Sequence, residues 1–172
     1  MRNVRVLAFS VLVFVIDQAT KVLARLYLQE EGSVSVIGNF FRLTYAENPG
    51  IAFGIQLGNK TLFTILIGIA SLAILYYLNK IRGELFPARF ALALIFGGAL
   101  GNLLDRIAFG KVVDFLDFEF FDFIMHRWPV FNVADMAITI GMVILIVIVL
   151  LDRGQDQEKQ ATKSDGETSE SV

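Results

Sequence analysis

The stretch VADMAITIGMVILIVIVLL, residues 133–151, decides the class of fold. It holds one charged residue, Asp135, in a run whose length is close to the roughly 20 residues that a helix needs to cross a bilayer. Similar apolar windows occur at residues 6–28, 61–79 and 86–104. Because the chain is also 55% hydrophobic and only 19% charged, with a mean hydropathy of +0.63, we predict an all-α membrane protein built as a four-transmembrane-helix bundle.

Two polar segments stand apart from these windows. Residues 32–44, GSVSVIGNFFRLT, are β-prone with glycine breaks and predict a small extracytoplasmic β-rich segment between helices 1 and 2. The composition then becomes polar and charged after the fourth window. We therefore predict a membrane domain over residues 1–152 and a disordered tail over 153–172.

The basic residues predict the orientation of the bundle. They precede the first window, flank the link between the second and third, and follow the fourth, which places both termini in the cytoplasm and residues 29–60 and 105–132 outside. With a net charge of -2 and no clustered basic face, the chain has no feature of a nucleic-acid partner. The basic residues used are Arg2, Arg5, Lys80, Arg82, Arg89, Arg153, Lys159 and Lys163.

The chain lacks the residues that several kinds of catalytic site require. The chain has no cysteine, so it has neither disulfides nor a thiol nucleophile. Its one histidine, His126, is too few for the usual zinc site, and neither H-E-x-x-H nor G-x-S-x-G occurs. We therefore predict no metal and no cofactor, and expect carboxylates to carry any chemistry.

Placing a charged residue inside an apolar membrane segment costs free energy, so each such residue is a candidate for a structural or functional role. Asp17 and Lys21 lie four residues apart in the first window, on one helix face, either as a structural pair or as part of a functional site. Asn102, Asp105 and Arg106 share one turn near the outer end of the third helix, either as a local ion pair or as an organising shell. Three glycines just before them, in FGGALG, indicate close helix packing.

The predicted topology brings two further acids, Asp114 and Asp135, to the same side of the membrane. Asp114 lies in KVVDFLDFEFFDF, residues 111–123, where β alternation points it opposite to its neighbours. Asp135 follows Asn132 at the start of the fourth helix, where Asn132 as N-cap and Asp135 in the first turn also form an ordinary helix start. Since the third helix runs outward and the fourth runs back, both acids occupy one boundary layer.

A pair of carboxylates at one boundary has a chemical use. One ionised acid takes a proton from water while the other, protonated, polarises a peptide carbonyl, so the pair hydrolyses a peptide bond without metal or nucleophile. Nothing in the pattern says which acid is the base. The surrounding Phe115, Phe118, Phe120, Phe121 and Phe123 are expected to lie in the membrane interface, with Asp117, Glu119 and Asp122 as a solvated face.

Five blocks of sequence carry a family resemblance that covers all but the polar tail. They are, in order, DQATK with Asp17 and Lys21, NPGIAFG with Asn48 and Gly50, GGALGNLLDR with Asn102, Asp105 and Arg106, VVDF with Asp114, and FNVADMA with Asn132 and Asp135. Each block alone is weak evidence, but five in order are specific. The chain resembles the bacterial lipoprotein signal peptidases (signal peptidase II).

The resemblance implies an aspartyl endopeptidase, active as a monomer among the lipids of the bacterial inner membrane, with its site at the outer face. It would remove signal peptides from diacylglyceryl-modified prolipoproteins, cutting just before the lipidated cysteine. The matching catalytic residues are Asp114 and Asp135. By the same resemblance, Asn48, Gly50, Asn102, Arg106 and Asn132 would hold substrate backbone or orient the acids, and Asp17, Lys21 and Asp105 would support the site.

Two other classes of function compete with this one. In a transporter or proton-conducting subunit, the acids and Lys21 would form a relay, which predicts acids spaced through the membrane rather than clustered at one boundary. In a non-catalytic assembly factor, Gly98 and Gly101 would offer a docking face, which leaves the converging acids unexplained.

Overall fold

The computed structural model describes residues 2–49, 51–52, 55–56, 60–81, 83, 86–119 and 127–169, with side chains over 5–49, 60–81, 83, 86–119 and 127–152. Its helices are α1 (Arg2–Leu28), α2 (Lys60–Lys80), α3 (Phe86–Phe109) and α4 (Val133–Ser169). Its strands are β1 (Ser33–Ile37), β2 (Phe41–Asn48), β3 (Ile51–Ala52), β4 (Ile55–Gln56) and β5 (Val112–Phe118).

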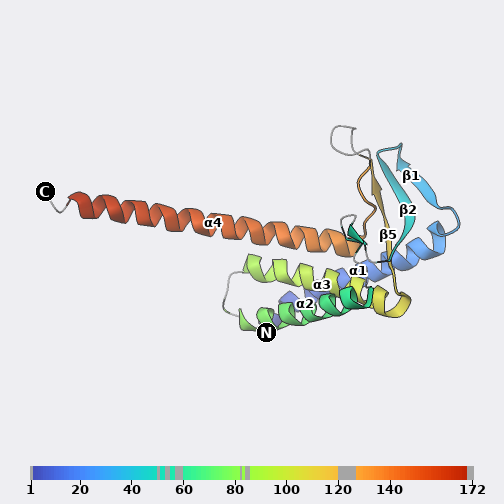
Figure 1. Cartoon of the computed structure of the whole chain (residues 1–172), viewed down its shortest axis with the longest axis horizontal. Coiled ribbons are helices and arrows are strands. Elements are labelled where there is room, and N and C mark those ends of the chain that lie inside the picture. The colour runs from blue at the N-terminus through green and yellow to red at the C-terminus, as the bar shows by residue number, and fades with distance from the viewer. Residues whose placement is uncertain are drawn as a thin grey trace.

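Four helices are long and apolar enough to cross a membrane, as predicted. Their spans are Arg5–Leu28, Lys60–Lys80, Phe86–Phe109 and Val133–Asp152. The third is the most buried, because α3 packs against α1, α2 and α4. In Figure 1 the N-terminus and the start of α3 lie at one end of the bundle, and the strands β1, β2 and β5 lie at the other.

Small residues of α3 let its neighbours approach closely, as the glycine pattern predicted. A Cβ placed on Gly97 would lie 2.6 Å from the backbone oxygen of Ser10 in α1. A Cβ on Gly98 would collide with the backbone oxygen of Ala134 in α4. Glycine at these two positions therefore permits backbone contact with helices on two sides.

The predicted sheet is present and larger than expected. Three antiparallel strands pair in the order β1-β2-β5, so the segment between α1 and α2 receives its third strand from the segment between α3 and α4. Its register places Ala46 opposite Asp114 and Arg42 opposite Asp117. Pairing of β2 with β5 satisfies backbone groups that would otherwise form an open edge.

The chain returns along the other side of β5 before α4 begins. Phe131 exchanges backbone hydrogen bonds with Leu116, at 2.8 and 3.0 Å, and the ring of Phe118 stacks on Phe41 and Phe131 at 4.6 and 5.8 Å. Asn132 follows directly after this pairing. The sheet thus fixes where α4 starts relative to β5.

Two predictions for the Phe-rich segment are wrong. Phe115 is buried in a cluster with Ala24, Leu28 and Val113, rather than lying in the interface. Asp117 is 1% exposed rather than solvated, because β2 and the returning segment flank it and supply its partners. Phe120, Phe121, Asp122, Phe123 and His126 lie outside the described residues.

The backbone of α4 continues as helix to Ser169, so the polar segment that begins at residue 153 starts within a helix rather than at its end. Figure 1 shows this part of α4 extending beyond the rest of the bundle. Over residues 153–169 it contains three Gln, two Glu and two Lys, which are good helix formers. The domain boundary at residue 152 stays a prediction.

Candidate active site

Asp114 and Asp135 are joined by one asparagine side chain, that of Asn132. Its Nδ2 donates to Asp114 Oδ1 at 2.6 Å, and its Oδ1 accepts from the backbone N–H of Asp135 at 3.0 Å. Asp135 Oδ2 in turn accepts from the backbone N–H of Asn132 at 3.2 Å. This reciprocal pair is a capping box, so the ordinary helix start and the meeting of the two acids are both present.

Helix α3 adds a second amide beneath the acids. Asn102 Nδ2 donates to Asp135 Oδ1 at 2.8 Å, and Asn102 Oδ1 accepts from Asn132 Nδ2 at 3.2 Å. Asn102 is 6% exposed and Asn132 is fully buried. The predicted site residues of β5, α3 and the start of α4 therefore form one hydrogen-bonded group.

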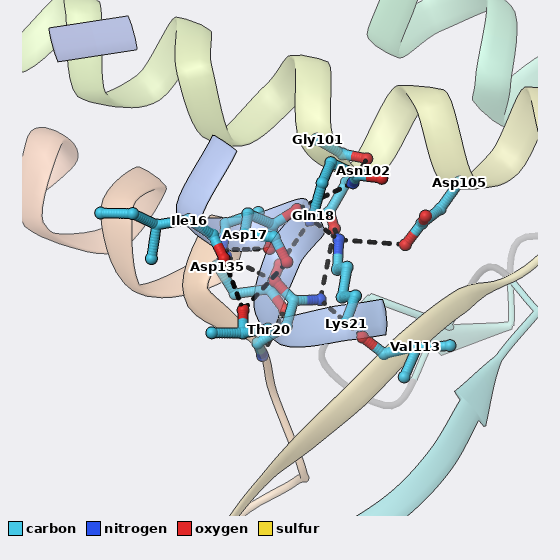
Figure 2. Close-up of polar contacts among 12 residues, drawn as sticks. Ile16, Asp17, Gln18, Thr20, Lys21, Gly101, Asn102, Asp105, Val113 and Asp135 are labelled. Atoms are coloured by element: carbon cyan, nitrogen blue, oxygen red, sulfur yellow. Dashed lines mark hydrogen bonds and ion pairs between the residues drawn. The ribbon is translucent and has the colours of Figure 1, made fainter. Parts of the chain in front are cut away.

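Under this group lies a buried cluster of charges, drawn in Figure 2. Lys21 Nζ lies 2.8 Å from Asp17 Oδ2, 3.1 Å from Asp105 Oδ2 and 2.8 Å from Asn102 Oδ1, and all three charged side chains are fully buried. Asp17 Oδ1 also accepts from the backbone N–H of Ala134 at 2.9 Å. The cluster ties α1 to α3 and to the first turn of α4.

The surroundings of Asp114 favour a proton on its carboxyl group. Burial first, and then the negative charge of Asp135, raise the pKa of Asp114 from 3.8 to about 7, against the lowering effect of hydrogen bonds with Asn48 and Asn132. Because such a pKa is close to neutrality, Asp114 can hold a proton and also release one under physiological conditions. A group of this kind in a cluster of acids suits general acid–base work.

The remaining predicted residues fall near the acids in different ways. Asn48, at the end of β2, hydrogen-bonds with Asp114. The Arg106 guanidinium donates to the backbone oxygen of Asn102 at 3.1 Å and lies over the Phe63 ring of α2, while its charge acts on both acids through space. Gly50 lies outside the described residues.

Two residues of this region were missed in the sequence. Arg25 pairs with Asp105 Oδ1 at 3.0 Å, and Gln18 donates to Asp17 Oδ2 and to the backbone oxygen of Gly101, each at 3.1 Å. Arg25 had a signal, since it follows Lys21 by four residues and shares its helix face. Gln18 had none, because its partner Gly101 is distant in sequence.

Metal binding has no candidate among the residues that the structure describes: no group of three or more His, Asp or Glu side chains there is arranged to hold an ion. The chemistry available from the described geometry is that of two carboxyl groups, two amides and a buried ammonium. One carboxyl can carry a proton while the other accepts hydrogen bonds, so together they can activate water and polarise a carbonyl group.

Comparison with known protein families finds one that the chain matches over most of its length. Residues 9–151 match the sequence model of the family described as signal peptidase (SPase) II. The chain belongs to the signal peptidase II family. The lipoprotein signal peptidase of Moorella thermoacetica is 48% identical over 153 residues, which cover 87% of this chain and 95% of that protein. That of Chlorobium phaeobacteroides is 40% identical over 141 residues, covering 79% and 84%.

Solved structures extend the similarity to the fold. A bacterial membrane enzyme determined by the in meso method at 2.3 Å is 33% identical, with a TM-score of 0.77 over 88% of this chain and 90% of that one. Family membership identifies this signal peptidase II homologue as an integral inner-membrane protease. The relay and docking hypotheses lose their support, since the acids of the supposed relay gather with Lys21 in one region, and Gly98 and Gly101 pack against Ala134 and Asp17 inside the bundle.

Proposed function

We propose that this chain is an aspartic endopeptidase that releases diacylglyceryl-modified prolipoproteins from their signal peptides by cutting just before the lipidated cysteine. Removal of signal peptides from prolipoproteins follows from membership of the signal peptidase II family. The observation that carries the aspartic mechanism is the link Asp114–Asn132–Asp135 at the sheet end of the bundle: the Asn132 side-chain amide donates to the Asp114 carboxyl group, and the Asn132 backbone N–H donates to the carboxyl group of Asp135.

In this mechanism the two aspartates share one proton. The ionised acid takes a proton from a water molecule as the water oxygen attacks the scissile carbonyl carbon, and the protonated acid donates to the carbonyl oxygen. Two carboxyl groups so close cannot both ionise easily, so the like charges help to keep one proton on the pair. Asn48, Gly50 and Arg106 are proposed to hold the substrate backbone beside them.

The place of the site suits a lipidated substrate. Acyl chains remain in the bilayer while the scissile bond meets water, and the acids lie where the helices end and the sheet begins (Figure 1). We propose that this end faces outward and that both termini lie in the cytoplasm, because the start of α1 and the end of α2, which carry the basic residues Arg5 and Lys80, lie at the opposite end (Figure 1). The enzyme is proposed to act as a monomer among membrane lipids.

The test is cleavage of a diacylglyceryl-modified prolipoprotein in detergent by wild type, Asp114→Asn and Asp135→Asn. An amide keeps the shape of each side chain but removes its acid–base function, so both variants should lose cleavage while their thermal melts stay cooperative. Near wild-type cleavage by either folded variant would refute the dyad. As a second arm, activity should persist in a chelator, and loss that an added metal restores would replace this mechanism with metal-assisted hydrolysis.

A further inference from the structure

The proposed mechanism gives no role to the buried ammonium of Lys21. Its Nζ donates to Asn102 Oδ1 at 2.8 Å and forms ion pairs with Asp17 Oδ2 at 2.8 Å and Asp105 Oδ2 at 3.1 Å, and its side chain is fully buried (Figure 2). Burying a charge costs several kcal/mol before its partners offset it. The carboxylates of Asp17 and Asp105 are sufficient to compensate the charge of Lys21. The third contact, to the neutral amide of Asn102, therefore needs a separate explanation.

That third contact fixes which way the Asn102 amide points. An ammonium can only donate, so the Asn102 atom 2.8 Å from Lys21 Nζ must be the carbonyl oxygen. The amide nitrogen then faces Asp135 and donates to its Oδ1 at 2.8 Å. With the amide reversed, an NH2 group would face the ammonium and an oxygen would face the carboxylate, and both contacts would be repulsive.

The orientation of the Asn132 amide is fixed in the same way, by a group that can only donate. The backbone N–H of Asp135 donates to Asn132 Oδ1 at 3.0 Å, so Asn132 Nδ2 must point to Asp114 Oδ1. Asp135 therefore accepts on both oxygens, from the locked Asn102 amide and from the backbone N–H of Asn132. It also lies in the first turn of α4, where the helix dipole favours a negative charge.

We infer that Lys21 is a positioning residue of the dyad: through Asn102 it holds Asp135 ionised, so Asp135 is the base that activates water and the dyad's proton resides on Asp114. This inference rests on the proposed aspartic mechanism and adds to it the roles of the two acids. A proton on Asp135 would weaken the hydrogen bonds from these two N–H donors, because a neutral carboxyl group is a poorer acceptor than a carboxylate.

Charge around the acids supports the same assignment. The ionisable groups whose charges act on Asp135 are Asp17 and Lys21 from α1, Arg106 from α3 and Asp114 from β5, and Asp105 of α3 pairs with Lys21. Lys21 is the cation closest to the amide that touches Asp135. The pKa of about 7 at Asp114, raised first by burial, is consistent with a proton that stays on this acid up to neutral pH.

The proton balance of the reaction closes with these roles. Asp135 takes a proton from water as the hydroxide oxygen bonds to the carbonyl carbon, and the proton of Asp114 passes to the carbonyl oxygen. When the C–N bond breaks, the proton on Asp135 passes to the leaving amine and the hydroxyl proton returns to Asp114. One water is consumed, a carboxylic acid and an amine form, and both aspartates regain their starting states.

The test compares Lys21→Met with Arg25→Met over a pH series, using the diacylglyceryl-modified prolipoprotein. Both substitutions remove a cation from the same carboxylate, Asp105, but only Lys21 touches Asn102. In Lys21→Met the acidic limb of kcat should move to higher pH by about one unit, with roughly tenfold lower kcat on that limb and an unchanged KM. Arg25→Met should keep the wild-type profile.

A uniform drop in activity with unmoved limbs in Lys21→Met would overturn the inference, since it would mean that Lys21 only supports the fold. An equal shift in Arg25→Met would overturn it too, because general charge rather than the Asn102 contact would then be responsible. In an Asn102→Ala background, Lys21→Met should move the limb no further, and a full second shift would contradict action through Asn102.

Lys21→Met leaves buried carboxylates undercompensated, so the double variant Lys21→Met/Asp17→Asn is measured beside it, with Asp17→Asn as its reference. The double variant restores the net charge of the cluster, and the Asn oxygen can still accept from Ala134. The same shift is expected relative to Asp17→Asn, and its absence contradicts the inference. Loss of cleavage in Asp114→Asn and Asp135→Asn tests the aspartic mechanism alone, so the two hypotheses fail separately.

Discussion

Two aspartates on β5, three residues apart, are both buried but have different kinds of partner. Asp114 and Asp117 are 4% and 1% exposed, yet the first meets amides and a second acid while the second meets a cation. Arg127 Nε lies 2.7 Å from Asp117 Oδ1, and Thr44 donates to Asp117 Oδ2 at 2.5 Å. Burial alone therefore does not distinguish the two carboxyl groups; the groups that contact them do.

The largest expected difference between the two acids is in turnover. Asp114→Asn should lower kcat about a thousandfold or more, because it removes an acid–base group from the dyad. Asp117→Asn, with the same burial on the same strand, should keep kcat within about threefold. The measurement is single-turnover cleavage of the prolipoprotein in detergent. Comparable losses of activity in the two variants would contradict the proposal that Asp114, and not Asp117, takes part in the reaction.

Stability should respond in the opposite sense. Asp117→Asn breaks the contact with Arg127, whose side chain is 45% exposed and can turn to water, so a loss of about 1–3 kcal/mol in the free energy of unfolding is expected. Asp114→Asn at pH 8 should leave stability unchanged or raise it, because the amide removes a charge that burial disfavours. Thermal melts of both proteins in one detergent compare these effects.

The pH dependence separates the acids at a smaller scale. Asp114 has a pKa raised above its unfolded value, so its contribution to stability is present below about pH 4 and is lost as pH rises through about 7. The melting temperature of wild type and of Asp117→Asn should therefore fall as the pH rises from 6 to 8, whereas that of Asp114→Asn should not.

The kcat of wild type and of Asp117→Asn should also fall above about pH 7, by roughly tenfold per pH unit. A flat profile in wild type would contradict the assignment of the proton to Asp114.

The smallest effect is expected at Thr44. Thr44→Val removes the hydroxyl that donates to Asp117 and keeps the shape of the side chain, so it should cost about 1 kcal/mol of stability. Neither limb of the pH profile of kcat should move, because Asp117 takes no part in the reaction. A moved limb would show that the ion pair influences the dyad after all.

The sequence predicted much of this site because its residues lie in short blocks with local rules. Asn132 and Asp135 are three residues apart and form the capping box that such spacing predicts. Asp17 and Lys21 share one helix face and do pair. Asp117 was misassigned because its partners, Thr44 and Arg127, come from segments that only the sheet brings beside it.

The sequence by itself determined the number of helices, since an apolar run of sufficient length has few alternatives to a membrane span. It also pointed to carboxylates, because a chain without cysteine and with one histidine has few other catalytic groups. Tertiary structure decided the rest. Pairing of β5 with β2 and with the segment before α4 sets Asp114 against Asn132, and the approach of α1 to α3 sets Lys21 against Asn102. These contacts join residues far apart in the chain, so their partners follow from packing and not from local spacing.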